Sequence, residues 1–525
     1  MGLKPAVDIS ILIPAYNAMP ELTRTLDSVV GQSYDAKRME VIVVDDCSND
    51  ESWEEVCRFA ASYPDLIVAE RLTAPSGSPA RPRNVALSKA RGEFVFFLDA
   101  DDWFNEHAVS KMLEHAREWR SDVLLVKLAG ANGREVPKSM FTHDQQKVDV
   151  YRSKVMWSLG PLKLFRRSLL LENDLRFFEE GMPEDLHVVV PAMCLADVVS
   201  VASDYDYCFV SLRNAALSQG ENASLSIWND WESNVRSYEA LMAFIDENTT
   251  DEQRSAALMR RLFRRDVFEM IASMGKGEPS RESYDRVKEL FKSYYVEQVY
   301  RTCPVEKRLV LDSFFFGSYE DLDRVVGAVS SGVGSACFDS RRGRLFGRLS
   351  HVRNVPRSDI TEGVQVSCAL ESFEFASDGE IDFSGCLMVD GVPCSWMKDA
   401  KMLLICKDGH GLWRASLPCE ISSVGSVASI ETMLRWKCKG TLKPILGWIS
   451  MLGASKLRLC LQINTRGYRR NCYLDKWSIK NVLACGSTQV VGDGVLLDGR
   501  SVILGGRVFK VLLSEEGKAM LVAAD

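Results

Sequence analysis

The sequence predicts an α/β N-terminal domain with a mostly parallel, Rossmann-like sheet, followed by a helical linker and then by one or two all-β sandwich modules. Three observations predict this order. Short apolar runs alternate with amphipathic stretches at the start, long charged helical patterns follow, and short alternating runs between Gly, Asp and Ser turns end the chain. We place the three domains at 1–226, 227–347 and 348–525.

The N-terminal domain rests on five apolar runs of strand length, rich in β-branched and aromatic residues. Between them lie stretches of helical spacing. In Pro20–Gln32, Leu22, Leu26 and Val29 fall on one face, and Asn49–Tyr63 opens with acidic residues, as helix starts do. The five predicted strands are Val7–Pro14, Glu40–Asp45, Leu66–Glu70, Glu93–Leu98 and Asp122–Leu128.

The linker and the C-terminal modules differ from the N-terminal domain in their pattern of apolar and charged residues. Asp251–Ser273 and Ser280–Tyr300 carry charges outside and apolar residues inside, which predicts helices. Beyond about residue 348, alternating runs predict strands of β-sandwich modules. Examples of these runs are Leu403–Lys407, Lys456–Ile463, Gly494–Leu497 and Arg507–Leu513.

Composition narrows the class of protein. The 525 residues are 46% hydrophobic and carry a net charge of −8, which makes nucleic acid an improbable partner. The sequence shows neither a signal peptide nor an apolar run long enough to span a membrane, and its 15 cysteines follow no zinc or disulfide pattern. We therefore expect a cytoplasmic protein with free thiols.

Polar side chains follow three predicted strands where each strand ends. Tyr16 comes just after Pro14, Asp45 and Asp46 end the second strand, and the segment Asp99-Ala100-Asp101-Asp102 follows the fourth. The carboxyl ends of parallel strands meet at one edge of a sheet, where ligands bind. Crowded carboxylates there favour a hard divalent cation, and a diphosphate can complete its ligands. Tyr16 can cover a base, while Asp45 or Asp46 can accept from a base N–H and Asp99 from ribose hydroxyls. A solvated acidic loop is the alternative.

Two further segments fit a phosphorylated ligand. Arg83 lies in a loop that contains Gly and Pro and leads into a helix. A guanidinium group can bind one oxyanion through two parallel hydrogen bonds. Asp185 follows Pro183-Glu184 before an apolar run, where it can act as a general base. The alternatives are a turn with solvent-facing arginines for the first segment and helix capping for the second.

Together these motifs resemble the family 2 glycosyltransferases of GT-A fold. The resemblance rests on Ile11-Leu-Ile-Pro-Ala-Tyr-Asn17, Val43-Val-Asp-Asp-Cys-Ser-Asn-Asp50, Pro82-Arg-Asn84 and Phe97-Leu-Asp-Ala-Asp-Asp102. Ser121–Lys127, Asn132-Gly-Arg-Glu-Val-Pro137 and Pro183-Glu-Asp185 are more specifically similar to the enzymes that attach β-N-acetylglucosamine to poly(ribitol phosphate) wall teichoic acid.

The resemblance implies an inverting transfer from UDP-N-acetylglucosamine that uses Mn²⁺ or Mg²⁺. Asp101, with Asp99, would ligate the metal, and Asp185 would be the base. It also implies C-terminal modules that form a trimer. The residues that would hold the nucleotide-sugar are Pro14, Tyr16, Asp45, Asp46, Arg83, Asp99, Ala100, Arg134 and Arg213.

Basic clusters are candidates for contact with a polyphosphate acceptor or with the anionic inner face of the membrane. Solvated surface is the commoner meaning of such clusters. Three alternatives stay open: a glucosyl- or galactosyltransferase for capsule, glycolipid or another teichoic acid; a non-catalytic glycan-binding scaffold; and C-terminal modules that bind carbohydrate instead of forming oligomers. The candidate acceptor residues are Arg260, Arg264, Arg341 and Arg348.

Overall fold

The computed structural model divides the chain into two compact units, Met1–Val299 and Tyr300–Asp525. It describes residues 7–181, 183–211, 231–250, 258–274, 279–296, 299 and 303–331, and beyond these the strands given below together with residues 352, 355, 357 and 360. The predicted domain limits at 226 and 347 differ from this division and stay predictions.

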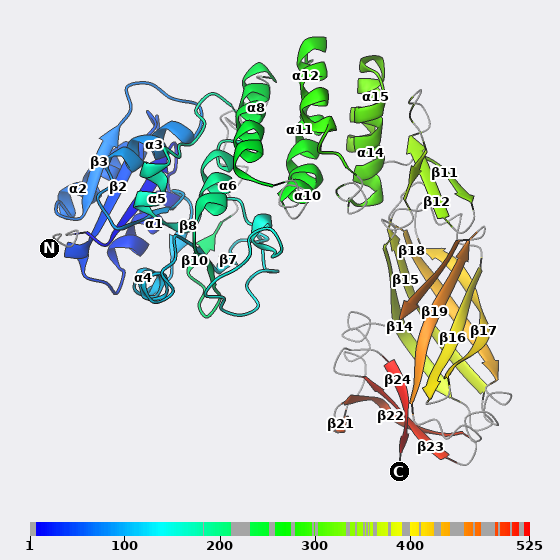
Figure 1. Cartoon of the computed structure of the whole chain (residues 1–525). Helices are drawn as coiled ribbons and strands as arrows, with labels where there is room; N and C mark the ends of the chain where they lie inside the picture. The colour runs from blue at the N-terminus through cyan, green and yellow to red at the C-terminus, as the bar shows by residue number, and fades with distance from the viewer. Residues whose placement is uncertain are drawn as a thin grey trace. The chain divides into compact units, whose positions relative to one another are not determined.

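The N-terminal unit is built on a seven-stranded sheet in the order β3-β2-β1-β4-β8-β6-β9, with helices against it (Figure 1). A smaller sheet, β5-β10-β7, lies beside the ends of its strands. The strands are β1 Ile9–Ala15, β2 Met39–Asp45, β3 Ile67–Arg71, β4 Phe94–Phe97, β5 Trp103–Phe104, β6 Val123–Val126, β7 Leu128–Gly130, β8 Lys163–Arg166, β9 Val199–Ala202 and β10 Cys208–Val210.

Helices and short helical turns join these strands and continue after them. Those of the α/β part are α1 Glu21–Val30, η1 Ala36–Arg38, α2 Ser52–Ser62, α3 Ala80–Lys89, α4 Ala108–Glu118, η2 Val155–Trp157, α5 Arg167–Glu172 and α6 Leu186–Leu195. Those that follow are α8 Trp231–Asn248, α10 Met259–Arg261, the π-helical segment η4 Leu262–Val267, α11 Phe268–Ser273 and α12 Arg281–Lys292.

The two faces of the main sheet pack against different helices, as the period-two alternation of a strand requires. Ile9, Ile11 and Ile13 of β1 join Leu26 of α1 and Met112 of α4 in one buried cluster. The opposite face of β1 and β2 packs against α3. Both faces are therefore buried, which explains the nearly continuous apolar runs of these strands.

The five predicted strands and the mostly parallel sheet are confirmed, with β1, β2, β3 and β4 all parallel to one another. The prediction missed β8, which lies between β4 and β6 and is antiparallel to both. This strand has only four residues and two of them are basic, so its sequence carries little strand signal.

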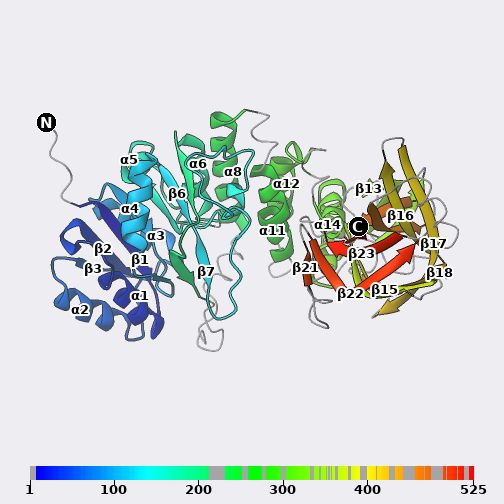
Figure 2. The same ribbon diagram turned by 90° about the horizontal axis from the view of Figure 1, so that it is seen from below.

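The C-terminal unit begins with helices and continues as antiparallel β-structure, as predicted (Figure 2). Its helical elements are α14 Val305–Phe316, η5 Tyr319–Asp321 and α15 Leu322–Ser331. Among the described residues, β11 Ala336–Arg341, β12 Arg344–Leu349 and β13 Ser358–Asp359 form one sheet. The other sheet contains β14 Gln365–Phe375, β15 Glu380–Asp390, β16 Asp399–Asp408, β17 Gly411–Val424, β18 Thr432–Thr441, β19 Lys456–Thr465, β20 Tyr468–Tyr473, β21 Gln489–Val491, β22 Gly494–Leu504, β23 Arg507–Leu513 and β24 Ala519–Ala524.

Candidate active site

The carboxyl ends of β1, β2 and β4 meet at one edge of the main sheet. Ala15 is in register with Asp45, and the backbone N–H of Asp46 donates to the Ala15 carbonyl at 2.8 Å. The N–H of Leu98 donates to the Leu12 carbonyl at 3.0 Å, which carries the β4 end alongside β1. Tyr16 is 38% exposed at this edge. The predicted convergence of the strand ends is therefore present.

Asp45 and Asp46 are buried and held by the protein itself. Arg71 Nε lies 3.1 Å from Asp45 Oδ2, whereas the buried Asp45 Oδ1 has no hydrogen-bond partner among the described residues. Asp46 accepts from both the N–H and the hydroxyl of Ser76, each at 2.8 Å. Burial raises the pKa of Asp46 even though these hydrogen bonds lower it. Of the two, Asp45 thus keeps an oxygen without a hydrogen-bond partner among the described residues, and this oxygen is buried.

Arg83 lies at the centre of the site. Its side chain is 4% exposed, and its Nη2 donates to Asp99 Oδ1 at 2.8 Å. Its Nη1 donates to Asp185 Oδ1, also at 2.8 Å, and lies 3.8 Å from Glu184 Oε1. The guanidinium also lies 5.1 Å from the ring centre of Phe177. One buried cation therefore joins the β4 end to the segment that starts α6, and Asp99 and Asp185 converge as predicted.

The Asp99–Asp102 turn is fixed from two sides. The Thr25 hydroxyl of α1 donates to the Ala100 carbonyl at 2.8 Å, and the Ser211 N–H donates to Asp102 Oδ1 at 2.9 Å. Burial, followed by the charge of Asp99, raises the pKa of Asp102 to about 8. The sequence interpretation gave Asp102 no role, yet its carboxyl group ties this turn to the segment after β10.

Arg134 and the Asp101 side chain belong to the same region. The charge of Arg134 lowers the pKa of Asp102, while that of Asp101 raises it, so both side chains lie within electrostatic range of the turn. Arg134 is exposed and Asp101 is half-buried. Pro14 and Ala100 are buried, and they contribute backbone to the site more than side chains. Arg213, the remaining predicted donor residue, lies outside the described residues.

Asp185 stands at the N-terminal end of α6, but its side chain makes no capping hydrogen bond. The carboxylate points to Arg83 and is 30% exposed. Burial raises its pKa, although Arg83 lowers it, and the neighbouring Glu184 has its pKa raised to about 7, first by burial and then by Asp185. The capping interpretation of Asp185 is therefore not supported, and a partly exposed carboxylate of raised pKa is suited to accept a proton.

Asn84 is a site residue that the sequence interpretation named only as part of a motif. Its amide nitrogen donates to the Phe177 carbonyl and to Glu179 Oε1, each at 2.9 Å. Its amide oxygen accepts from the Phe177 N–H at 2.9 Å. The residue next to Arg83 thus fixes the segment that leads to Asp185. The Pro82-Arg-Asn84 motif marked Asn84 in the sequence, but it could not reveal the contact with Phe177, which is 93 residues away.

The segment before Asp185 is also pressed against α8. A Cβ added at Gly181 would lie 2.6 Å from the Ser233 carbonyl oxygen, closer than real Cβ atoms approach. We expect Gly181→Ala to lower the free energy of unfolding by about 1–3 kcal/mol, as overpacking does, because backbone must shift to make room. Urea unfolding of both proteins measures this. Gly160→Ala is the matched control, since its Cβ would meet nothing within 4 Å, and equal losses in the two variants would contradict the prediction.

The acceptor candidates belong to elements other than those that form this edge of the sheet. Arg260 is exposed in α10, and the guanidinium of Arg264 lies 4.9 Å from the ring centre of Trp157. Arg348 is half-buried in β12, where its buried Nε has no hydrogen-bond partner among the described residues. Arg341 belongs to β11, and its side chain lies outside the described part of the structure. Their roles stay predictions.

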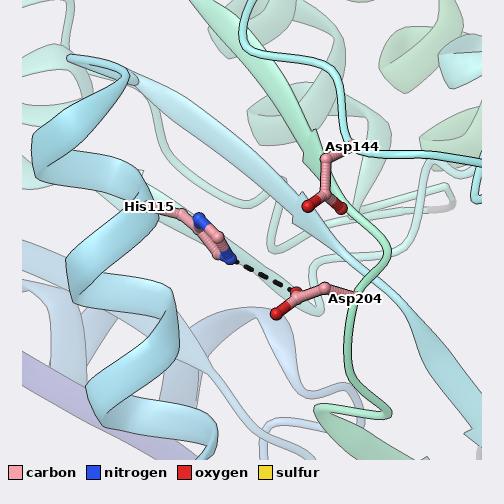
Figure 3. A group of neighbouring side chains, drawn as sticks. All are labelled: His115, Asp144 and Asp204. Atoms are coloured by element: carbon pink, nitrogen blue, oxygen red, sulfur yellow. Dashed lines mark hydrogen bonds and ion pairs between the residues drawn. The ribbon is translucent and has the colours of Figure 1, made fainter.

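A second group with metal-ligand chemistry lies elsewhere in the N-terminal unit (Figure 3). The ligand atoms of His115, Asp144 and Asp204 all lie within 4.8 Å of one another. Lys111 Nζ, however, donates to Asp204 at 2.7 Å, and hydrogen bonds from Lys111 and Tyr207 outweigh burial and lower the pKa of Asp204 to about 2. Because Lys111 already supplies positive charge there, we assign this group to a salt-bridge network and keep the predicted metal site at Asp99 and Asp101.

Comparison with known proteins agrees with this geometry. Residues 10–172 match the model of "Glycosyl transferase family 2". A poly(ribitol-phosphate) beta-glucosyltransferase of Bacillus spizizenii is 37% identical over 48% of this chain and 39% of its own length. The poly(ribitol-phosphate) beta-N-acetylglucosaminyltransferase TarS of Staphylococcus aureus is 38% identical over 41% of this chain and 36% of its own length. These matches thus span about two fifths of each relative.

Solved structures extend the likeness to the whole fold. The crystal structure of S. aureus TarS aligns with 99% of this chain and 85% of its own, with a TM-score of 0.68 and 20% identity. A structure of TarS residues 1–349 in complex with UDP-GlcNAc aligns with 67% of this chain and 99% of its own, with a TM-score of 0.57 and 27% identity.

Among the described residues, no helix is both long and apolar enough to cross a bilayer. The match over residues 10–172 gives the N-terminal part of the chain a domain similar to glycosyltransferase family 2, and the structural likeness gives it the GT-A fold.

Proposed function

We propose that this chain is an inverting, metal-dependent glycosyltransferase that moves N-acetylglucosamine from UDP-N-acetylglucosamine onto poly(ribitol phosphate). The observation that carries the proposal is the bridge from Asp99 through the buried Arg83 to Asp185. It places a predicted donor-site carboxylate and a predicted base on one cation at the carboxyl edge of the sheet. The match to the family and the names of the relatives support the reaction class and the acceptor.

The proposed chemistry is a single displacement at the anomeric carbon. Asp185 accepts the proton of the acceptor hydroxyl as the new bond forms, and the diphosphate departs on the opposite face. Arg83 holds Asp185 in place and contributes positive charge near the departing group. Tyr16 and Asp45 are the proposed nucleotide contacts. Tyr16 is exposed at the end of β1, and Asp45 Oδ1, although buried, has no hydrogen-bond partner among the described residues.

The residues of the Asp99–Asp102 turn fit a hard divalent cation. After burial, Asp99 and Asp101 both act to raise the pKa of Asp102, so the carboxyl groups of this turn lie within electrostatic range of one another. Asp99 is 34% exposed, so its second oxygen can reach a ligand while the first pairs with Arg83. Asp101, with Asp99, would hold Mn²⁺ or Mg²⁺. Once bound, the cation would stabilise negative charge on the diphosphate.

We expect Asp101→Asn to weaken Mn²⁺-dependent binding of UDP-sugar by about tenfold or more, because one carboxylate ligand is lost. Isothermal titration with UDP-N-acetylglucosamine, with Mn²⁺ and with EDTA, measures this. The affinity of the unaltered protein should fall with EDTA, whereas the variant should respond little. Asp65→Asn, at an exposed loop position, is the control. Equal metal dependence in all three proteins would remove the metal from the proposal.

The donor sugar has a specific second candidate. The B. spizizenii relative is named a beta-glucosyltransferase, whereas TarS is named a beta-N-acetylglucosaminyltransferase, and both match this chain at similar identity. A panel of UDP-glucose, UDP-galactose, UDP-N-acetylglucosamine and UDP-N-acetylgalactosamine, with poly(ribitol phosphate) as acceptor and UDP release as the measurement, decides between them. The absence of acceptor-dependent UDP release with every donor would overturn the proposed function itself.

We propose that Arg260 and Arg264 contact acceptor phosphates, because one is exposed and the other lies beside Trp157 within the same unit. Arg341 and Arg348 are proposed to do so from the C-terminal unit. Assembly as a homotrimer through residues 348–525, cytoplasmic location and peripheral contact with the inner membrane face are likewise proposals.

A further inference from the structure

Lys163 is a buried charged residue that the proposed reaction has not used. It is the first residue of β8, the strand that the sequence did not reveal, and is paired with Leu125 of β6. Its side chain is 1% exposed. A buried ammonium group is costly unless other groups compensate it, so its presence calls for a reason.

The compensation around Lys163 is incomplete. Its Nζ donates to the Gly160 carbonyl at 2.5 Å and lies 3.5 Å from the Ser158 hydroxyl. An ammonium group has three donors, so at least one is left. Within the described part of the chain, no carboxylate oxygen lies close enough to Lys163 Nζ, at 4.0 Å or less, to form a salt bridge with it. Leu164 pairs with Phe96 in antiparallel register, so Lys163 begins β8 beside the carboxyl end of β4, the strand end that carries Asp99. Burial lowers the pKa of Lys163 to about 7, while the charge of Asp185 acts to raise it.

Asp185, for its part, has more acids than cations around it. Asp99 from the β4 end and Glu184 from its own segment both lie close to Arg83, which is shared among all three carboxylates. Arg83 and then Lys163 are the groups that lower the pKa of Asp185. On the α8 side, the neighbouring His187 contacts Ser237, which carries no charge.

We propose that Lys163 is a positioning residue for the transfer reaction, whose buried ammonium from β8 balances the charge of Asp185 and keeps that carboxylate ionised and oriented toward the acceptor hydroxyl. This inference rests on the proposed function, in which Asp185 is the base. The competing explanation is structural: Lys163 only fastens the turn at Ser158 and Gly160.

Steady-state kinetics separates the two explanations. A base must be ionised, so kcat falls as the pH drops through the pKa of Asp185. Removing a nearby positive charge raises that pKa, and Lys163 is mostly protonated below about pH 7, where its own pKa lies. Lys163→Met should therefore move the acidic limb of kcat to higher pH by about one unit, which is about a tenfold lower rate on that limb. The KM for UDP-sugar should stay the same.

Matched variants guard against misfolding and nonspecific loss. Lys163→Gln can still donate to the Gly160 carbonyl but carries no charge, so it should show the same shift. Ser158→Ala removes a partner of the ammonium without changing charge, and Lys89→Met removes an exposed lysine that is paired with Glu70. Both should keep the limb of the unaltered protein. The inference would be overturned if the acidic limb of the kcat profile stayed at the same pH in Lys163→Met and Lys163→Gln. It would also be overturned if Ser158→Ala moved this limb by the same amount.

A second measurement does not need activity. Thermal midpoints of Lys163→Met, Asp185→Asn and the double variant at pH 6.5 form a double-mutant cycle in the full chain. The loss in the double variant should be smaller than the sum of the single losses, because each single change removes the same attraction. Strict additivity would refute the electrostatic interaction between the two charges. If the unaltered protein transfers no sugar but the cycle shows coupling, the proposed function fails and the charge pair stands.

Discussion

Replacing Asp185 by asparagine is expected to lower kcat for sugar transfer by about 10²–10⁴-fold, the usual contribution of a positioned general base. Asparagine has nearly the same shape, and its amide oxygen can still accept from Arg83 Nη1, so the site should stay assembled. The affinity for UDP-sugar should therefore change little. Acceptor-dependent UDP release gives kcat, and isothermal titration with UDP-sugar gives the affinity.

Glu180→Gln is the control for this experiment. Glu180 lies on the same segment, is largely exposed, and faces Arg236 at 3.6 Å, so its loss removes an acid without touching Arg83. We expect its kcat to match that of the unaltered protein. A parallel loss of kcat, UDP-sugar affinity and thermal midpoint in Asp185→Asn would assign Asp185 to the structure of the α6 start instead of to the reaction.

The strand-end part of this site was predictable from sequence because local patterns carry it. A short aromatic and β-branched run such as Phe94–Phe97 is typical of a buried strand, and acids that follow such a strand are expected at the edge of the sheet. Asp45, Asp46 and Asp99 follow from this rule without any knowledge of distant contacts. The same reasoning placed Tyr16 at the exposed end of β1.

The rest was not predictable because it depends on pairings between distant segments. Lys163 stands in a short basic segment that looks like surface, and only its place between β4 and β6 makes it buried. Asn84 holds Phe177 through backbone atoms, which no side-chain pattern reveals. The interpretation of Arg83 as a ligand of phosphate missed its two carboxylate partners, since Asp185 is 102 residues away.

These missed contacts share one physical cause. The site collects carboxylates for its chemistry, and their repulsion in a partly buried place must be balanced by cations that the fold delivers from other elements. Arg83 comes from α3 and Lys163 from β8, two elements that are far apart in the sequence and both precede the Asp185 segment. The acids can be recognised in the sequence. The cations that balance their repulsion can be recognised only in the tertiary structure.

Replacing Arg83 by glutamine is expected to have the largest effect on stability and to abolish transfer. Removing one partner of a buried ion pair costs about 3–5 kcal/mol, because charges are left without compensation. Asp99 and Asp185 are 34% and 30% exposed, so water screens part of this loss, and we expect a decrease in the free energy of unfolding of about 2–3 kcal/mol. Urea unfolding at pH 7 measures it.

Arg83→Lys separates the charge of Arg83 from its geometry. Lysine keeps the positive charge, but an ammonium is a point donor, whereas Nη1 and Nη2 of the planar guanidinium reach Asp185 and Asp99 at 2.8 Å each. We expect Arg83→Lys to regain most of the stability lost in Arg83→Gln, while kcat stays at least about tenfold below that of the unaltered protein, since one carboxylate is no longer held. Arg81→Gln, two residues earlier and exposed, is the control. If Arg83→Lys restored kcat in full, charge alone would suffice, and the bridging geometry from Asp99 to Asp185 would have no part in the reaction.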